Sequence, residues 1–213
     1  MQAIVSDRYG TPDVMALRQI EKPVPADNEV LVKVVATGLN ALDWHLLLGE
    51  PFFMRFTFGM FRPKITILGA DMAGIVETVG KDVKRFKPGD AVFGDMVERG
   101  IGGLAEYVTV PENLLVAKPV NLTFQETSTI PVAATTALQG LRDVGGLQPG
   151  MKVLINGASG GVGTWAVQIA KALGAEVTAV CSTSKMDQAR MLGADHVIDY
   201  TQEDFTRNDS SMT

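Results

Sequence analysis

The sequence contains one cysteine, Cys181, and two histidines among 213 residues. One cysteine cannot form a disulfide within the chain, and a zinc site rich in thiolates needs several Cys or His ligands. We therefore expect a protein of a reducing compartment, the cytoplasm, without bound metal. The amino terminus has no basic segment followed by an apolar one, so we expect no secretory signal there.

An excess of charge of either sign is also missing. The 19 Lys and Arg residues stand against 24 Asp and Glu, which gives a formal net charge of -5. A partner with a phosphate backbone or an anionic membrane surface would call for a basic excess, so neither nucleic acid nor membrane is expected. The longest stretches without charge are interrupted by proline or by several glycines, and neither predicts a membrane span. An apolar content of 46% excludes a disordered chain.

Short strands separated by turn residues are predicted over the first 120 residues. They are rich in Val, Ile or Ala and fall at 1–5, 29–37, 73–79, 91–93 and 105–110. This spacing favours an all-β barrel or sandwich. A helix interrupts it after Asn40, where Asn40 and Asp43 have the spacing of a capping box. The phenylalanines between Phe52 and Phe61 are expected to form a core or a pocket wall.

The pattern changes from about Leu122 onward. A helical stretch leads into alternating elements: a strand at 153–156, a helix at 163–173, a strand at 176–181, a helix at 185–192 and a strand at 196–200. Neighbouring parallel strands need a crossover, so alternating strands and helices predict a parallel α/β sheet. Apolar residues at helical spacing, from Val162 to Leu173, support the first helix.

The turn between the first of these strands and its helix reads NGASGGVG, residues 156–163. Aligned on Gly163, it is a dinucleotide-binding fingerprint with Ala158 in the place of the first glycine. Glycine at this turn lets the backbone approach a pyrophosphate, and the first amides of the helix point at the anion. The alternative is a tight strand-to-helix turn without a ligand. The strand before it and the amphipathic helix after it favour the cofactor. The predicted cofactor-binding residues here are Ser159, Gly160, Gly161, Val162 and Gly163.

The end of the second strand bears on which cofactor is bound. An NAD site usually has a carboxylate there, which holds the ribose 2′-hydroxyl. This chain has Cys181, Ser182 and Thr183, followed by Lys185. Hydroxyls and a lysine can bind a 2′-phosphate, so the sequence favours NADP(H).

Several longer motifs resemble the medium-chain dehydrogenase/reductase superfamily over residues 1–205. They are GADMAGIVETVGKDVKRFKPGDAVFG, GGLAEYVTVPENLLVAKP, NGASGGVGTWAVQIAKALGAEV and GADHVIDY, in that order. The resemblance implies a GroES-like β-barrel catalytic domain, expected at residues 1–121. It further implies a Rossmann NADP-binding domain, expected at 122–213, with the cofactor in the cleft between the two.

The zinc alcohol dehydrogenases of this superfamily carry metal ligands at three positions that are here Asn40, Ala70 and Val132. The chain therefore resembles the zinc-independent quinone oxidoreductase branch more closely. That resemblance implies an enzyme that transfers hydride from NADPH to a small-molecule quinone or activated enone. Two alternatives stay open, namely a non-catalytic NADPH-binding protein and an enoyl-thioester reductase.

The resemblance also implies roles for single residues. Asn40 and Asp43 match a motif near the nicotinamide, and Thr136 matches a threonine on the nicotinamide side. Ser182, Lys185 and Tyr200 match the 2′-phosphate pocket of the NADPH-using members. His45 is the one histidine near the site by sequence and is a candidate proton donor, with a packing or surface role as the alternative. Several quinone reductases have tyrosine at about Pro51, and this chain does not.

A complete Rossmann sheet has six strands, and the sequence predicts three. Residues 206–213 read as a polar tail. We therefore expect the sequence to be a fragment of a longer family member, a truncated product, or a sequence from which further residues are omitted, with apolar surface that favours association, for example as a homodimer.

Overall fold

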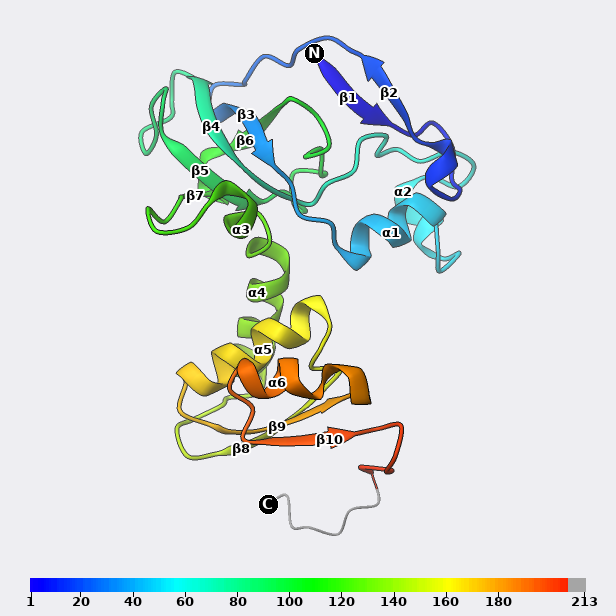
Figure 1. Cartoon of the computed structure of the whole chain (residues 1–213). Helices are drawn as coiled ribbons and strands as arrows, with labels where there is room; N and C mark the ends of the chain where they lie inside the picture. The colour runs from blue at the N-terminus through cyan, green and yellow to red at the C-terminus, as the bar shows by residue number, and fades with distance from the viewer. Residues whose placement is uncertain (207–213) are drawn as a thin grey trace. The chain divides into compact units, whose positions relative to one another are not determined.

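A computed structural model describes residues 1–206. The expected polar tail lies almost wholly outside the described residues. The chain divides into two compact units, Met1–Val132 and a second unit that begins at Ala133 (Figure 1). The sequence placed the boundary after residue 121. The structure places it later because α3 (Phe124–Thr127) packs against strands β3 (Glu29–Ala36) and β4 (Asp71–Val79) of the first unit.

A five-stranded antiparallel sheet forms the main part of the first unit, in the order β6-β3-β4-β5-β7. Its remaining strands are β5 (Ala91–Asp95), β6 (Tyr107–Pro111) and β7 (Leu115–Ala117). Alternate residues along the strands, such as Val30 and Val32 of β3, are fully buried. They pack in one core with Val92 and Met72. The four longer strands were predicted to within a few residues. The three-residue β7 was missed because it is too short to show alternation.

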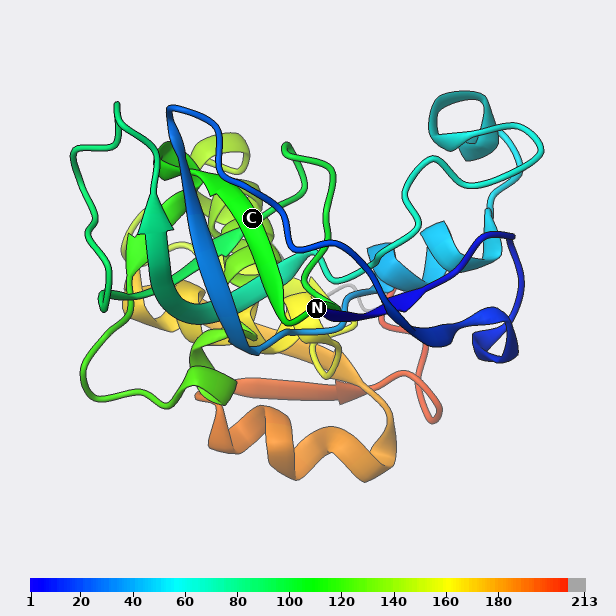
Figure 2. The same cartoon turned by 90° about the horizontal axis from the view of Figure 1, so that it is seen from above.

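A two-stranded antiparallel ribbon of β1 (Gln2–Val5) and β2 (Ala16–Gln19) completes the β structure of this unit. A 3-10 turn, η1 (Pro12–Val14), lies between its strands, and a second, η2 (Glu112–Leu114), precedes β7. Helices α1 (Ala41–Leu48) and α2 (Met54–Phe58) lie on the side of this ribbon, away from the five-stranded sheet (Figure 2). Leu46, Leu47, Leu68, Ala70 and Ile101 form a second core there. Strand β2 was not predicted, because all four of its residues are exposed and it lacks an apolar face.

Four of the five phenylalanines of residues 52–61 do not form the expected core or pocket wall. Phe52, Phe53, Phe56 and Phe61 are between 61% and 91% exposed. Helix α2 has only five residues, so one pair at i, i+4 spacing reaches the core, namely Met54 and Phe58. Phe56 lies on the exposed side of this helix, and Phe52, Phe53 and Phe61 lie outside it.

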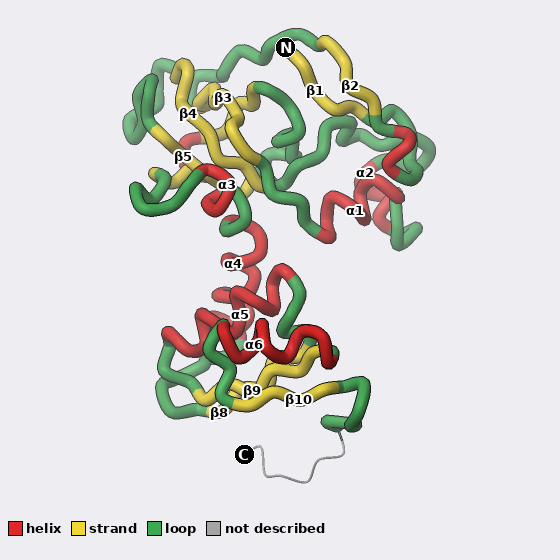
Figure 3. Tube along the Cα trace, viewed as in Figure 1, coloured by secondary structure: helices red, strands yellow, loops and turns green. Residues whose placement is uncertain are grey.

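The second unit contains a three-stranded parallel sheet in the order β10-β9-β8, as the alternating pattern predicted. The strands are β8 (Lys152–Asn156), β9 (Glu176–Cys181) and β10 (His196–Asp199). Helices α5 (Gly161–Ala172) and α6 (Met186–Met191) lie on one face of the sheet (Figures 1 and 3). A short 3-10 turn, η4 (Thr183–Lys185), precedes α6.

Small side chains let α5 approach the strands closely. Gly163, Ala166, Val167 and Ala170 are buried against the sheet. Val162, which the helical spacing placed on the same face, lies in the first turn of α5 and is 41% exposed. Before β8 the chain forms α4 (Pro131–Leu138) and the π-helical turn η3 (Gln139–Val144). No helix within residues 1–206 has the length and apolarity to cross a membrane.

Candidate functional site

The predicted cofactor residues of the second unit come together at one edge of its sheet. All three strands are parallel, and the register pairs Asn156 with Val180 and Asp199 with Cys181. The carboxyl ends of the strands therefore share an edge, which is where open α/β sheets bind ligands. The glycine turn follows β8 at this edge, Ser182 follows β9 and Tyr200 follows β10.

The glycines of the turn have different roles. A Cβ at Gly163 would lie 2.1 Å from the carbonyl oxygen of Gly157, so the close packing of helix and turn requires glycine there. Gly160 has an ordinary φ of -79°, and a Cβ there would come no nearer than 3.4 Å to any atom. A Cβ at Gly161 would meet nothing within 4 Å. The fold itself therefore does not demand glycine at 160 or 161, and both positions keep space open in front of α5.

The amino end of α5 offers three backbone donors to that space. The first bond of the helix runs from the Thr164 N–H to the Gly160 carbonyl, at 2.9 Å. The N–H groups of Gly161, Val162 and Gly163 have no acceptor within residues 1–206. Free amides at the positive end of a twelve-residue helix form an anion site. The residues present thus fit a pyrophosphate.

The edge beside the turn contains the side chains predicted for the 2′-phosphate. Ser182 is half-buried, Lys185 is exposed and the Tyr200 side chain is 57% exposed. A cavity of about 580 Å³ is lined by Asn156 and residues 200–205. This volume lies in the range of small-molecule sites.

Acidic groups also reach this edge, which the sequence argument did not anticipate. Glu203 and Asp204 line the cavity. Asp199 is buried and accepts hydrogen bonds from the Thr183 hydroxyl and from the N–H and hydroxyl of Thr201, the last two at 2.9 and 2.7 Å. These bonds, the one from Thr183 first, hold the pKa of the Asp199 carboxyl below its usual range. A lack of carboxylates at this edge therefore does not support the expected preference for NADP(H).

In the first unit, Asp43 joins the start of α1 to the chain before β4. One carboxylate oxygen, Oδ2, accepts from the backbone N–H of Asn40 at 2.9 Å, as the capping spacing predicted. The other, Oδ1, accepts from the N–H groups of Gly69 and Ala70 at 2.8 and 3.2 Å. Asp43 is 5% exposed. With each oxygen engaged, its visible role is to hold Asn40 in place.

A residue that the sequence argument missed, Asp71, lies next to this pair. It is 1% exposed, and its Oδ2 accepts from the Asn40 side-chain Nδ2 at 3.0 Å. Its Oδ1 accepts from the N–H of Val132 at 2.9 Å. Burial raises the pKa of Asp71 to about 6, against the lowering effect of these two hydrogen bonds. The sequence did contain a signal that could have identified Asp71, namely a charged residue within a strand that is otherwise apolar.

The three positions that hold zinc ligands in the alcohol dehydrogenases meet around Asp71. Asn40 and Val132 donate to its carboxylate, and Ala70 precedes it in the chain. Ala70 is fully buried. Within residues 1–206, no group of three or more His, Cys, Asp or Glu side chains is arranged to hold a metal ion.

An apolar cavity of about 450 Å³ adjoins Asn40 and Asp43 in the first unit. Apart from these two, all of its lining side chains are hydrophobic: Ile4, Pro12, Met15, Leu39, Trp44, Leu47, Leu68 and Leu104. A mostly apolar pocket with a few polar groups is typical of small-molecule sites. The cavity therefore suits an uncharged, hydrophobic molecule.

Two other predicted residues, His45 and Thr136, do not line either cavity. His45 is exposed on α1, does not line the apolar cavity, and its side chain bonds to no residue within 1–206. Its role as a proton donor stays a prediction. Thr136 lies on an exposed position of α4, and its proposed contact with the nicotinamide also stays a prediction.

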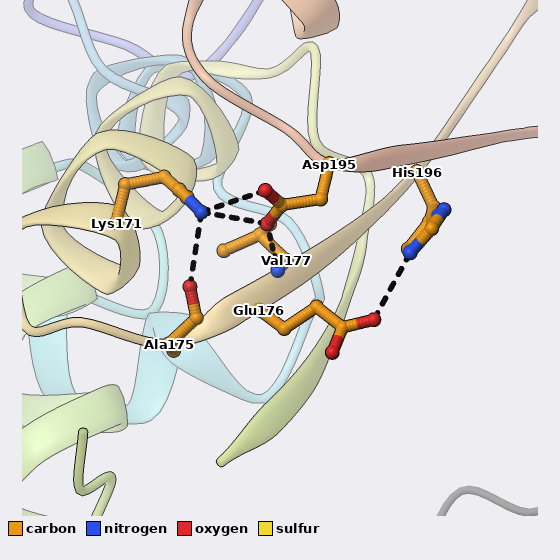
Figure 4. Close-up of polar contacts among 6 residues, drawn as sticks. All are labelled: Lys171, Ala175, Glu176, Val177, Asp195 and His196. Carbon is orange, nitrogen blue, oxygen red and sulfur yellow. Dashed lines mark hydrogen bonds and ion pairs between the residues drawn. The ribbon is translucent and has the colours of Figure 1, made fainter. Parts of the chain in front are cut away.

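The remaining histidine belongs to a polar network at the opposite edge of the parallel sheet (Figure 4). Asp195 accepts from the Lys171 ammonium at 2.8 and 2.7 Å and from the Val177 N–H at 2.7 Å. The His196 Nε2 lies 3.0 Å from the Glu176 Oε1. These residues lie near the amino ends of β9 and β10, away from the glycine turn, and they join α5 to the strands.

Comparisons with known proteins agree with this architecture. A family profile described as "Alcohol dehydrogenase GroES-like domain" matches residues 26–120, and one described as "Zinc-binding dehydrogenase" matches residues 161–213. The chain is 42% identical over 210 residues to the chloroplastic quinone-oxidoreductase QR1 of Triphysaria versicolor, covering 94% of this chain and 61% of that protein. It is 39% identical over 206 residues to the 2-methylene-furan-3-one reductase of Solanum lycopersicum, covering 92% and 51%.

A solved structure of the Escherichia coli quinone oxidoreductase complexed with NADPH superimposes with a TM-score of 0.81 at 28% identity. The match covers 96% of this chain and 60% of that one. The chain thus spans between about half and three fifths of the length of these relatives. Together with the sheet topology, these matches confirm a GroES-like domain followed by a Rossmann-like one. The chain belongs to the medium-chain dehydrogenase/reductase superfamily, among its quinone oxidoreductase-like members.

Proposed function

We propose that this protein is an oxidoreductase that transfers hydride from NADPH to a quinone or an activated enone without zinc. The observation that carries the proposal is the apolar cavity whose only polar lining residues are Asn40 and Asp43. The names of two relatives, a quinone oxidoreductase and a reductase of an unsaturated furanone, support this substrate class.

The cofactor would be held by the second unit. The amides of Gly161 to Gly163 and the hydroxyl of Ser159 would receive the pyrophosphate. Ser182, Lys185 and Tyr200 would receive the 2′-phosphate, and Thr136 would contact the nicotinamide side. NADPH, when bound, supplies the hydride.

The apolar cavity contributes in two ways. Its hydrophobic walls exclude water, which strengthens any polar contact made inside it. During hydride transfer to a conjugated carbonyl, negative charge develops on the carbonyl oxygen, and a fixed donor near that oxygen lowers the barrier. Two neutral groups that line the cavity can donate, the Asn40 carboxamide and the Trp44 indole N–H, and Asn40 is the one that a buried carboxylate orients. Asp43 cannot serve because its oxygens already accept three backbone N–H groups.

The test is NADPH oxidation with matched panels of quinones, enones and enoyl thioesters. We expect turnover with apolar quinones or enones and a loss of rate when a charged group is added to the ring. NADPH binding without turnover on any panel would favour the non-catalytic alternative. Turnover confined to thioesters would favour the enoyl-thioester reductase.

Replacing Lys185 with alanine is expected to reduce the preference for NADPH over NADH. The ammonium would make a charge-assisted contact with the 2′-phosphate, worth about 1.5 to 3 kcal/mol at most, and NADH lacks that group. Titration calorimetry with both cofactors measures the change. Lys152→Ala is the matched control, since Lys152 is also exposed but lies at the amino end of β8. Equal losses for NADPH and NADH would count against the assignment.

Activity is expected to be insensitive to chelators. The positions that carry zinc ligands in the alcohol dehydrogenases are here a carboxamide, a buried alanine and a valine, which supply no ligand set for zinc. Metal analysis of the purified protein, before and after dialysis against EDTA, checks this expectation. One firmly bound zinc per chain whose removal abolishes turnover would contradict it.

A further inference from the structure

The Asn40 carboxamide and the Asp71 carboxyl form a buried pair behind the apolar cavity. Asn40 lines the cavity, whereas Asp71 does not. The two are joined by the bond from Asn40 Nδ2 to Asp71 Oδ2, at 3.0 Å. The second oxygen of Asp71 accepts from the Val132 N–H at 2.9 Å. Asp71 therefore contacts Asn40, which lines the cavity, but Asp71 itself does not line it.

We propose that Asp71 is a positioning residue that sets which face of the Asn40 carboxamide meets the substrate carbonyl. The inference rests on the proposed function, because it gives the pair a task in hydride transfer. Asp71 acts through Asn40 and makes no contact with the substrate.

The hydrogen-bonding chemistry of the pair supports this role. A carboxylate only accepts, so it holds one hydrogen of the Asn40 Nδ2, and the Val132 N–H already occupies its other oxygen. The second hydrogen of Nδ2 has no acceptor within residues 1–206 and is the one that can donate to a substrate carbonyl. An asparagine at position 71 would present one acceptor and one donor. It could satisfy Val132 only by turning its own NH2 toward the NH2 of Asn40, which would force the Asn40 amide to rotate. The carboxylate therefore selects a single orientation of Asn40.

The surroundings hold the pair rigid. Gly38 is closely packed beside Asp71, since a Cβ there would lie 2.4 Å from the Ser128 carbonyl oxygen and 3.3 Å from the Asp71 Cβ. The other charged groups that act on Asp71 are Asp43 of α1 and Asp95 of β5, which faces Asp71 in the strand register. Within residues 1–206 no basic side chain forms an ion pair with Asp71, so the donors from Asn40 and Val132 are the partners of its carboxylate.

A double-mutant cycle tests the proposal. Asp71→Asn and Asn40→Ala are each expected to lower kcat about tenfold, with the Kd for NADPH unchanged, and the double variant should lose no more than Asn40→Ala alone. Thr37→Val is the matched control, since it removes a neighbouring bond to Asp71 without touching the carboxylate. It should retain kcat. Losses that add in the double variant would overturn the proposal.

A spectroscopic measurement separates this inference from the proposed function. In the NMR spectrum of the wild-type protein, one side-chain amide proton of Asn40 should be protected from solvent exchange, and Asn40→Ala identifies the resonance. In Asp71→Asn the chemical shift should move and protection should be lost, while Thr37→Val should preserve both. These NMR results would support the positioning role even if the protein reduced no quinone or enone. A failure to reduce any quinone or enone would refute only the proposed function. An unprotected Asn40 amide in the wild type would refute the positioning role, and this readout needs no folded Asp71 variant.

Discussion

A valine at position 160 is expected to reduce NADPH affinity by at least about a hundredfold, roughly the loss of two charge-assisted hydrogen bonds, while the second unit stays folded. The backbone at Gly160 has ordinary dihedral angles, and a Cβ there comes no nearer than 3.4 Å to any atom. The larger side chain would instead fill the space in front of the amides of α5. The pyrophosphate could then no longer reach those amides.

The matched variant is Gly163→Val, three residues along the same turn. A Cβ there would lie 2.1 Å from the Gly157 carbonyl oxygen and 2.8 Å from the Ala158 Cα, both of them backbone atoms. We expect this variant to lose structure in the second unit as well as cofactor binding. Titration calorimetry and circular dichroism on both proteins separate the two effects. A folded Gly160→Val protein with wild-type affinity would show that the turn is structural only.

The stability of the first unit is expected to fall by about 3 kcal/mol as the pH rises from 4 to above 6, through Asp71 alone. Burial raises the pKa of this carboxyl from 3.8 to about 6. Between these values the folded protein binds the proton and the unfolded chain has released it. The stabilisation is therefore fully present below the unfolded pKa and is lost as the pH rises through the folded pKa. Asp71→Asn should remove this part of the pH dependence.

Denaturant unfolding followed by tryptophan fluorescence measures the effect. The sequence has two tryptophans, Trp44 in the first unit and Trp165 in the second, so Trp165→Phe leaves a signal from the first unit alone. Glu112→Gln is a control of opposite sign. Hydrogen bonds from the backbone N–H groups of Arg85 and Lys84 lower the pKa of Glu112, so this residue stabilises the fold at high pH. Its removal should steepen the fall. An identical pH profile for wild type and Asp71→Asn would contradict the assignment.

The sequence by itself determined the elements whose signal is local. The glycine turn, its following helix and the alternation of strands and helices after Leu122 all follow from residue spacing, and the parallel sheet has the predicted strands. The capping contact of Asp43 with Asn40 was likewise readable, because it spans three residues. Element type and order depend on dihedral preferences and on apolar periodicity, which neighbouring residues set.

Only the tertiary structure decided which distant groups share a site. Asp71 meets Asn40 and Val132 across separations of 31 and 61 residues, and these contacts arise from strand pairing and loop paths that no local pattern encodes. The same holds for Asp199, which reaches the cofactor edge through the register of β10 on β9. The phenylalanines of residues 52–61 show the converse. Their hydrophobicity suggested burial, but only Phe58 packs against a core, and Phe52, Phe53, Phe56 and Phe61 are exposed, because contact with a core depends on tertiary packing and not on hydrophobicity alone.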